Sequence, residues 1–216
     1  MSRPFLYKTK SSPPAAAVRM LAQIIGLELD YKDLELLKME HKAPEYLKLN
    51  PMGTVPTLKD GNFIVSDSHT IMQYLLSKYA TKQQQEELYP SDLQTRALIN
   101  QYLFFDTGIF FIRFKNVVLP ILFEGAKGPA EKALADIDEA FGILEAYIGD
   151  KEYMIGDRVT IADISLGATA ACMRGIHTLD PVKFSRVTKW MSRLEQKPFF
   201  KIMLDAVEIL KSRLKK

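Results

Sequence analysis

The sequence of 216 residues predicts two fused domains, a small α/β domain of order βαβαββα followed by an all-helical domain. Within the first 80 residues, short strand-like and helix-like segments alternate. A polar stretch follows, and beyond it apolar residues recur at helical spacing almost to the last residue. We therefore place the domains at residues 1–80 and 93–216, and we treat residues 81–92 as the linker between them.

The elements of the first domain follow from its apolar patterns and from the residues that end them. Gly26 ends the first predicted helix. Asn50-Pro51 ends the second, because the residue before a proline is disfavoured in a helix. The turn 59–62, Lys-Asp-Gly-Asn, joins two β-rich runs into a hairpin. The predicted strands are 4–7, 27–36, 55–58 and 63–65, and the predicted helices are 14–25, 43–49 and 67–79.

The second domain is predicted to consist of helices alone. One helix start is marked by Thr160 and Asp163, which have the spacing of a capping box with the shorter acid in the place of glutamate. We expect a structural role for this pair. The predicted helices cover about 94–122, 129–148, 161–173, 184–196 and 199–212.

Composition excludes several classes of protein. Hydrophobic residues make up 47% and charged residues 25%, which is typical of a soluble globular protein. The 29 basic and 26 acidic residues are scattered, so nucleic acid is not an expected partner. Cys172 is the only cysteine, which argues against a disulfide framework. With no secretory signal and no apolar run of about 18 residues, we expect a cytoplasmic protein that does not enter a membrane.

Ser12 lies where the first strand ends and the first helix begins, in the run Ser11-Ser12-Pro13-Pro14. The free N–H groups and the dipole of a helix N-terminus stabilise negative charge, and a thiolate is such a charge. A hydroxyl aimed at the same sulfur would add a hydrogen-bond donor. Two alternatives remain open from the residues alone. Ser12 is simply an N-cap, or Tyr7 is the donor to the thiol.

Two further motifs suggest a site for an extended peptide. Val55-Pro56 begins a predicted strand, where a cis bond would leave the backbone of Val55 free to pair with a peptide, although an ordinary edge strand explains the proline equally well. Asp67-Ser68 then opens a helix directly after a strand, where an acid can accept an ammonium group and a hydroxyl can bind a carboxylate. The alternative is that Asp67 or Ser68 is only the N-cap.

Taken together and in order, these motifs resemble those of the cytosolic glutathione transferases, with the insect delta/epsilon group as the nearest pattern. The resemblance covers nearly the whole chain and implies a thioredoxin-like first domain, glutathione as cosubstrate, and a homodimer. A metal is not expected, because the sequence has no Cys-x-x-Cys or His-Glu-x-x-His motif. It implies Ser12 as the residue that activates the thiol. The motifs that carry it are Leu6-Tyr7, Ser12-Pro13-Pro14, Leu49-Asn50-Pro51, 54–58, 67–75, Leu88-Tyr89-Pro90, 105–108 and 159–163.

The same resemblance implies which residues bind each part of glutathione. The backbone of Val55 would pair with the cysteinyl part, Asp67 and Ser68 would hold the γ-glutamyl end, and His41 would approach the glycyl end. The full set of implied glutathione ligands is His41, Gly53, Thr54, Val55, Asp67, Ser68 and His69.

The sequence departs from the family pattern at two places. Met52-Gly53 stands where a histidine is common before the proline, so one glutathione contact is missing or replaced. Ala16 stands where an arginine is usual, and Arg19 is the nearest positive charge.

The second domain is expected to bind a small hydrophobic electrophile. Phe111, Phe114, Lys115 and Val118 share one helix face, which by resemblance borders this pocket, although packing in the core explains aromatic stripes equally well. We predict conjugation of glutathione to such electrophiles, a detoxification reaction. The alternatives are a zeta-like maleylacetoacetate isomerase, suggested by Ser11-Ser12 and by 50–52, and a non-catalytic carrier or scaffold of the same fold.

Overall fold

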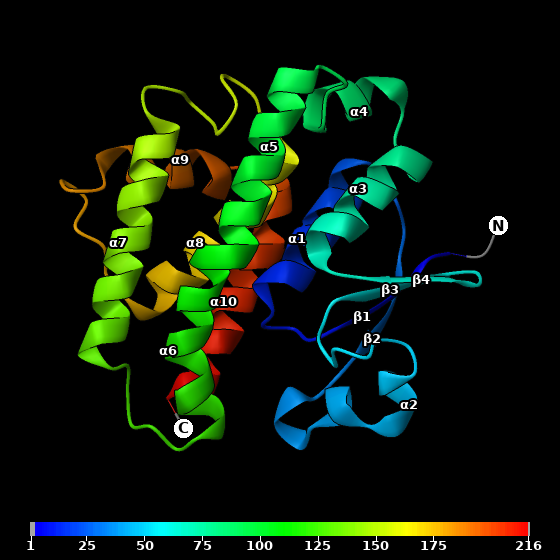
Figure 1. Ribbon diagram of the computed structural model, residues 1–216, viewed down its shortest axis with the longest axis horizontal. Coiled ribbons are helices and arrows are strands. Elements are labelled where there is room, and N and C mark those ends of the chain that lie inside the picture. The colour runs from blue at the N-terminus through cyan, green and yellow to red at the C-terminus, as the bar shows by residue number, and fades with distance from the viewer. Residues whose placement is uncertain (1–2, 216) are drawn as a thin grey trace.

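The computed structural model describes residues 3–215 of the chain. Two domains lie side by side, with a sheet and its helices in one and a helical bundle in the other (Figure 1). In the first domain the elements are β1 (Phe5–Lys8), α1 (Pro13–Ile24), β2 (Asp30–Asp33), two short 3₁₀ turns (Leu36–Lys38 and Glu40–Lys42), α2 (Pro44–Leu47), β3 (Thr57–Asp60), β4 (Phe63–Ser66) and α3 (Ser68–Tyr79).

The regular elements of the second domain are helices, and the loop before α8 (Ile161–Ile176) adds two isolated β-bridges, Tyr153 with Gly156 and Ile155 with Arg158. Its elements are α5 (Leu93–Phe105), a π-helical turn (Asp106–Phe110), α6 (Phe111–Phe123), α7 (Glu131–Ile148), α8 (Ile161–Ile176), α9 (Ser185–Glu195), a 3₁₀ turn (Pro198–Phe200) and α10 (Lys201–Leu214), and α4 (Lys82–Leu88) precedes them.

The sheet has the order β2-β1-β3-β4, with β1 parallel to β2 and antiparallel to β3. Tyr7 pairs with Thr57, and Thr57 pairs with Ser66. These three paired residues lie near the end of β1, at the start of β3 and at the end of β4. The three strand ends therefore meet at one edge of the sheet. Leu6 and Leu58 point together into the core, and both are fully buried.

Three predicted segments differ from the structure. The extended segment 27–36 is a strand only at Asp30–Asp33. The proposed linker 81–92 contains α4, since Thr81 and Gln84 form a capping box that starts a helix in this polar stretch. The single helix predicted over 94–122 is interrupted by the π turn Asp106–Phe110.

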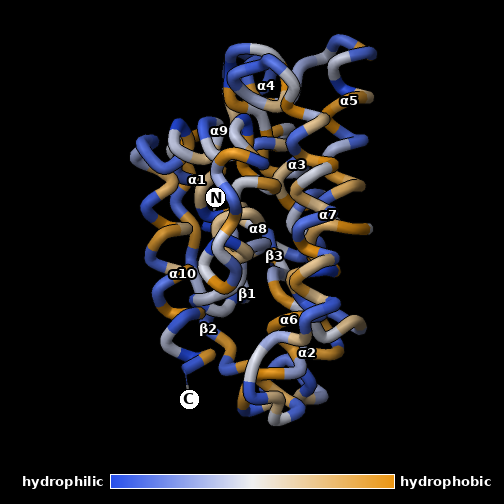
Figure 2. Tube along the Cα trace, turned by 90° about the vertical axis from the view of Figure 1, so that its left-hand side faces the viewer, coloured by the Kyte–Doolittle hydropathy of each residue, from blue (hydrophilic) through white to orange (hydrophobic). Residues whose placement is uncertain are grey.

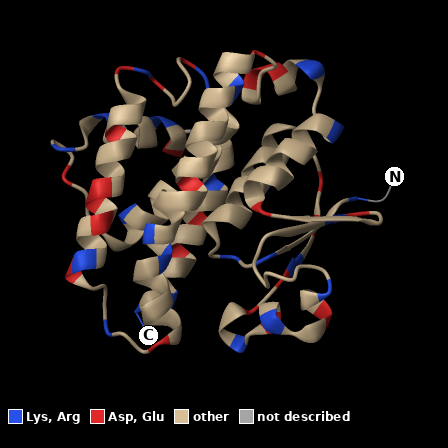
Figure 3. Cartoon of the chain, in the orientation of Figure 1, with Lys and Arg blue, Asp and Glu red and all other residues tan. Residues whose placement is uncertain are grey.

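Helix α8 is the centre of the packing. Every residue from Ile161 to Met173 is buried, and α1, α5 and α10 pack against the helix. Hydrophobic and hydrophilic positions alternate along the surrounding helices, as is typical of amphipathic helices that pack with one face (Figure 2). Charged residues of both signs are interspersed over both domains (Figure 3). The core therefore joins the two domains instead of lying within each alone.

The carboxylate of Asp163 holds the start of α8 in place. It accepts hydrogen bonds from the N–H (2.9 Å) and the hydroxyl (2.9 Å) of Thr160, from the N–H of Met154 (2.8 Å) and from the indole of Trp190 (2.9 Å). Burial raises the pKa of Asp163, and the four hydrogen bonds oppose this rise only in part. The predicted capping pair is thus confirmed, and it also ties α9 and the loop before α8 to the helix.

Replacing Thr160 with alanine should lower the free energy of unfolding by about 1 kcal/mol, because one of these hydrogen bonds and an N-cap hydroxyl are lost. Urea denaturation would measure the change. Ser192→Ala is the matched control, since that exposed hydroxyl only bonds to a carbonyl of its own helix. Affinity for glutathione, the expected ligand of the other domain, should stay the same, and its loss at unchanged stability would contradict the structural role.

Candidate active site

The motifs singled out in the first domain meet at one edge of the sheet. Ser12 follows the end of β1, Val55-Pro56 precedes the start of β3, and Asp67-Ser68 follows the end of β4. The register of the three strands brings these segments to the same edge, on the side that faces the helical domain in Figure 1. Residues far apart in the sequence therefore form one candidate site.

Ser12 is the N-cap of α1, and its hydroxyl oxygen accepts from the N–H of Ala15 at 3.3 Å. The predicted supply of free N–H groups at this helix start is wrong. Pro13 and Pro14 carry no N–H, and the N–H of Ala16 donates to the carbonyl of Ser12. The Ser12 hydroxyl keeps its hydrogen for an outside acceptor. An anion at this terminus would meet the helix dipole and this one hydroxyl donor.

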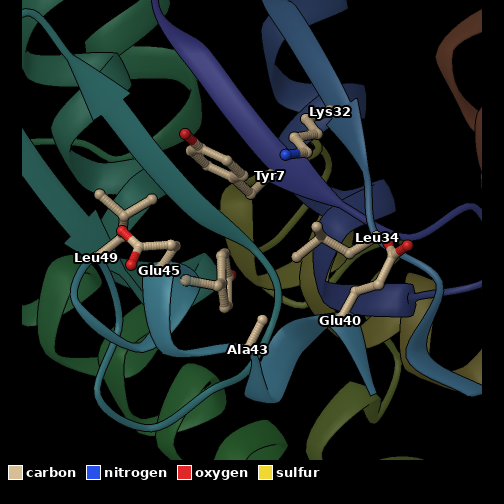
Figure 4. A pocket seen from close by; sticks show the side chains of 8 residues that line it. Tyr7, Lys32, Leu34, Glu40, Ala43, Glu45 and Leu49 are labelled. Carbon is tan, nitrogen blue, oxygen red and sulfur yellow. The ribbon is translucent and has the colours of Figure 1, made fainter. Parts of the chain in front are cut away.

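Tyr7, the other candidate donor, points to the sheet face opposite Leu6. Its ring packs edge-on against Tyr46, with centroids 5.6 Å apart. Both rings border a cavity of about 380 Å³ between the sheet and the segment 40–49, and Figure 4 shows Tyr7 at its wall. Ser12 does not line this cavity, so the hydroxyl groups of Tyr7 and Ser12 lie in different environments. The lining residues are Tyr7, Lys32, Leu34, Glu40, Ala43, Glu45, Tyr46 and Leu49.

The peptide bond between Val55 and Pro56 is cis, which was one of the two alternatives that the sequence left open. Within residues 3–215, no hydrogen bond uses the backbone N–H or C=O of Val55. The turn around it is held by the carbonyl of Thr54, which accepts from the hydroxyl of Tyr46 (2.5 Å) and the amide of Asn50 (2.9 Å). Asn50 is almost completely buried. The turn is therefore rigid, while the polar backbone groups of Val55 are available to an extended ligand.

Position 53 requires glycine, because its backbone conformation and its close neighbours leave no room for a side chain. Its φ is +58°, and a Cβ would lie 2.8 Å from both the carbonyl of His41 and the amine of Lys42. That amine donates to the carbonyl of Met52 at 3.0 Å. Sequence reasoning missed Lys42. The absence of the usual histidine at position 53 could have indicated it, since a small residue leaves room for a neighbouring cation.

His41 lies beside this lysine at the edge of the candidate site. Burial, and then the positive charge of Lys42, lower the pKa of His41. Its Nδ1 atom is buried and lacks a hydrogen-bond partner within the described part of the chain. A buried nitrogen without a hydrogen-bond partner is unusual in a folded protein, and it marks His41 as a residue whose surroundings are incomplete without a further polar group.

Asp67 is the N-cap of α3, and Ser68 is the first residue of the helix. Asp67 has a φ of +75°, which is rare for a residue with a side chain and is common at ligand sites. Its Oδ1 accepts from the N–H groups of His69 and Thr70, each at 3.0 Å. The capping alternative is therefore realised. It does not use Oδ2, which makes no hydrogen bond within residues 3–215, nor the hydroxyl of Ser68.

His69 was predicted to contact glutathione, yet its ring faces the helical domain. Nε2 lies 2.6 Å from the hydroxyl of Ser165 and 3.2 Å from the carboxylate of Asp106, and Nδ1 lies 2.9 Å from the hydroxyl of Thr107. Asp106 also accepts from Ser165 (2.6 Å) and Thr169 (2.8 Å). Both ring nitrogens are occupied, so the side chain of His69 joins the domains and leaves only its backbone near the site.

This polar network explains the π turn. Asp106 is the first residue of the turn and is 4% exposed, and its carboxylate is held by side chains of α8. An extra residue in the turn shifts the helix so that Asp106 meets these partners and Phe105 and Phe110 still reach the core. The interruption comes from contacts between elements distant in the sequence.

The predicted electrophile face is divided in the structure. Phe114 and Val118 are each 4% exposed and belong to the core. Phe111 is half-buried and stacks on Phe114 with centroids 5.8 Å apart, and Lys115 is exposed. The alternative of core packing therefore holds for two of the four residues, and Phe111 and Lys115 are the ones that present surface.

Residues 3–215 contain no group of three or more His, Cys, Asp or Glu side chains that could hold a metal ion. They also contain no helix that combines the length and the apolar character needed to cross a bilayer.

The His69 network predicts a pH dependence of stability. Burial alone would lower the pKa of His69, but the hydrogen bond and the charge of Asp106 outweigh it, and the net pKa is raised. Because the folded pKa is above the unfolded value, this contribution is fully present below about pH 6.5 and is lost as pH rises through the raised pKa.

Replacing His69 with glutamine should therefore destabilise the protein more at pH 6 than at pH 8.5. Urea denaturation of both proteins at both pH values would measure the difference. An equal loss of unfolding free energy at the two pH values would show that the charged form of His69 contributes nothing.

Comparison with known proteins agrees with this geometry. The profile of the "Glutathione S-transferase, N-terminal domain" family matches residues 6–83, and that of the "Glutathione S-transferase, C-terminal domain" family matches residues 68–198. Glutathione S-transferase 1 of Manduca sexta is 34% identical over 198 residues, which cover 91% of this chain and 89% of the relative.

Solved structures of insect proteins share the fold over almost their full length. An epsilon-class glutathione S-transferase of the housefly, Musca domestica, superposes with a TM-score of 0.90 at 33% identity, covering 98% of each chain. A glutathione transferase homolog of Drosophila mojavensis with bound glutathione gives 0.92 at 35% identity, covering 100% of this chain and 97% of the other. The chain belongs to the glutathione S-transferase family.

Proposed function

We propose that the chain conjugates the thiolate of glutathione to small hydrophobic electrophiles, with Ser12 as the residue that holds and ionises the thiol. The observation that carries this proposal is the hydroxyl of Ser12 at the start of a helix whose first two residues are prolines. Family membership supports the reaction, and a solved relative from Drosophila mojavensis contains glutathione.

Glutathione would lie along the sheet edge as an extended peptide. The free N–H and C=O of Val55 would pair with the backbone of its cysteinyl residue. At the γ-glutamyl end, Oδ2 of Asp67 would accept from the ammonium, and the hydroxyl of Ser68 with the start of α3 would bind the carboxylate. The glycyl carboxylate would then approach His41 and Lys42, on the other side of the Val55 turn.

The chemistry is the attack of sulfur on carbon. A free thiol has a pKa of about 8.5, so the enzyme must favour the thiolate to use it near neutral pH. The hydroxyl of Ser12 donates to the sulfur, and the dipole of α1 adds to the stabilisation. The thiolate forms a C–S bond with the electrophilic carbon, and the leaving group departs with its electron pair. The proton of the thiol goes to solvent.

The electrophile would bind against the helical domain. Phe111 supplies a half-buried aromatic surface next to exposed Lys115, and we propose these two residues for its pocket. We also propose a cytoplasmic homodimer. The two-fold dimers of the family support this assembly, and Phe104, which is 75% exposed on α5, is a residue that such an interface could cover. A chloronitrobenzene substrate tested beside maleylacetoacetate would separate transferase from isomerase.

Replacing Ser12 with alanine should raise the pKa of the bound thiol toward its value in water and lower kcat/KM about 100-fold, as for the loss of one preorganised donor. Thiolate absorbance against pH and turnover of chlorodinitrobenzene would measure both. Ser12→Thr is the matched control, because it keeps a hydroxyl. If the thiol bound to the wild type has the pKa it has in water, and Ser12→Ala leaves it there, the protein is a carrier and the proposed function fails.

Replacing Lys42 with alanine should weaken glutathione binding about fivefold, since an exposed ion pair contributes up to about 1 kcal/mol. Affinity for γ-glutamylcysteine, which lacks the glycyl residue, should not change. Lys48→Ala is the control, because that lysine pairs with Glu45 on the surface. Equal losses for both ligands would place Lys42 outside the glycyl end.

A further inference from the structure

Arg213 joins three segments that are remote in the sequence. It lies in the last turn of α10, and one guanidinium nitrogen donates to the hydroxyl of Ser11 at 3.3 Å. The other terminal nitrogen lies 3.4 Å from the carboxylate of Glu35. The side chain of Arg213 is 19% exposed and that of Glu35 is 46% exposed, so the arginine is mostly covered while its acidic partner faces water on one side.

The helix that carries Arg213 is firmly held. Met203, Val207 and Leu210 of α10 are buried, and α10 packs against α8 and α1. Since α8 is fixed by its own buried cap, Arg213 extends from a rigid support. Its place at the C-terminal end of the helix is also favourable for a positive charge.

Both acceptors belong to loops of the candidate site. Ser11 directly precedes Ser12. Glu35 opens a short loop that closes on itself, because its N–H donates to the carboxylate of Glu40 at 2.8 Å, and Glu40 directly precedes His41. Arg213 therefore connects the loop that bears the thiol donor with the loop that leads to the glycyl end.

The Ser12 loop is tied to its own helix mainly at one point. The N–H of Ala16 donates to the carbonyl of Ser12 at 2.9 Å, whereas the bonds made by the N–H and the hydroxyl of Ser12 are long, at 3.4 and 3.3 Å. The two following prolines offer no N–H with which to tie the loop down. The charge-assisted bond from Arg213 to Ser11, at 3.3 Å, adds a restraint from a distant helix.

We infer that Arg213 is a positioning residue that acts through Ser11, holding the Ser12 loop at a set distance from the Glu35–Glu40 loop and so aiming the Ser12 hydroxyl at the sulfur. The inference rests on the proposed function. An arginine suits the task because its planar fork reaches two separate acceptors at once, which the single amine of a lysine cannot do in the same geometry.

The test compares Arg213→Ala and Arg213→Lys with wild type. We expect Arg213→Ala to lower kcat with chlorodinitrobenzene about tenfold, as a displaced catalytic group does, and to raise the pKa of the bound glutathione thiol. Arg213→Lys should recover only part of both. Lys211→Ala is the matched control on the same helix, since its amine bonds to Glu208 one turn earlier, and it should behave as wild type.

A double-mutant cycle with Ser11→Ala tests the route of the effect. In that background, Arg213→Ala should change kcat and the thiol pKa much less, because the hydrogen bond is already absent. Arg213→Ala with the kcat and thiol pKa of Lys211→Ala would overturn the inference, whether or not the melting temperature falls. Failure of the proposed function would look different, since the wild type itself would then leave the bound thiol protonated.

Discussion

The buried carboxylate of Asp163 is the constraint on which the rest of the structure depends. Four donors converge on it and set where α8 begins, and α8 is the helix against which α1, α5 and α10 pack. Because Ser12 lies at the start of α1, the position of the proposed thiol donor depends on the same support. A cap in the helical domain thus determines geometry at the sheet edge, through packing and not through direct contact.

A second polar cluster complements this hydrophobic support. His69, at the start of α3, reaches Asp106 and Ser165 in the helical domain. Asp67 and Ser68 directly precede His69, so the proposed γ-glutamyl end of the site lies next to a bond that joins the domains. The domains therefore meet through a side chain whose backbone adjoins the proposed ligand site, so a ligand bound there would lie close to the contact that docks the domains. The buried network remains satisfied only in one arrangement, which makes the docking specific.

Much of the fold followed from local patterns in the sequence. The βαβαββα order, the helices of the second domain, the cis bond at Val55-Pro56 and the Thr160–Asp163 pair depend on periodicity, proline geometry and capping, which act within a few residues. The π turn at Asp106 could not be predicted this way, because its cause lies in side chains about 60 residues away.

The residues of the candidate site also fall into those that local patterns predict and those that depend on tertiary contacts. Ser12, Val55 and Asp67 sit at strand ends that local patterns already mark, whereas Lys42 and Arg213 matter only through the space and the partners that tertiary structure gives them. The direction of the His69 ring was missed for the same reason.

The close approach at Gly53 has an evolutionary consequence. A side chain at position 53 would meet the backbone carbonyl of His41 as closely as the Lys42 amine, and only the amine can swing away without moving the backbone. The φ of +58° adds strain for any residue other than glycine. Recovering the family's usual histidine would therefore require the backbone path of this turn to change, not only the residue at position 42.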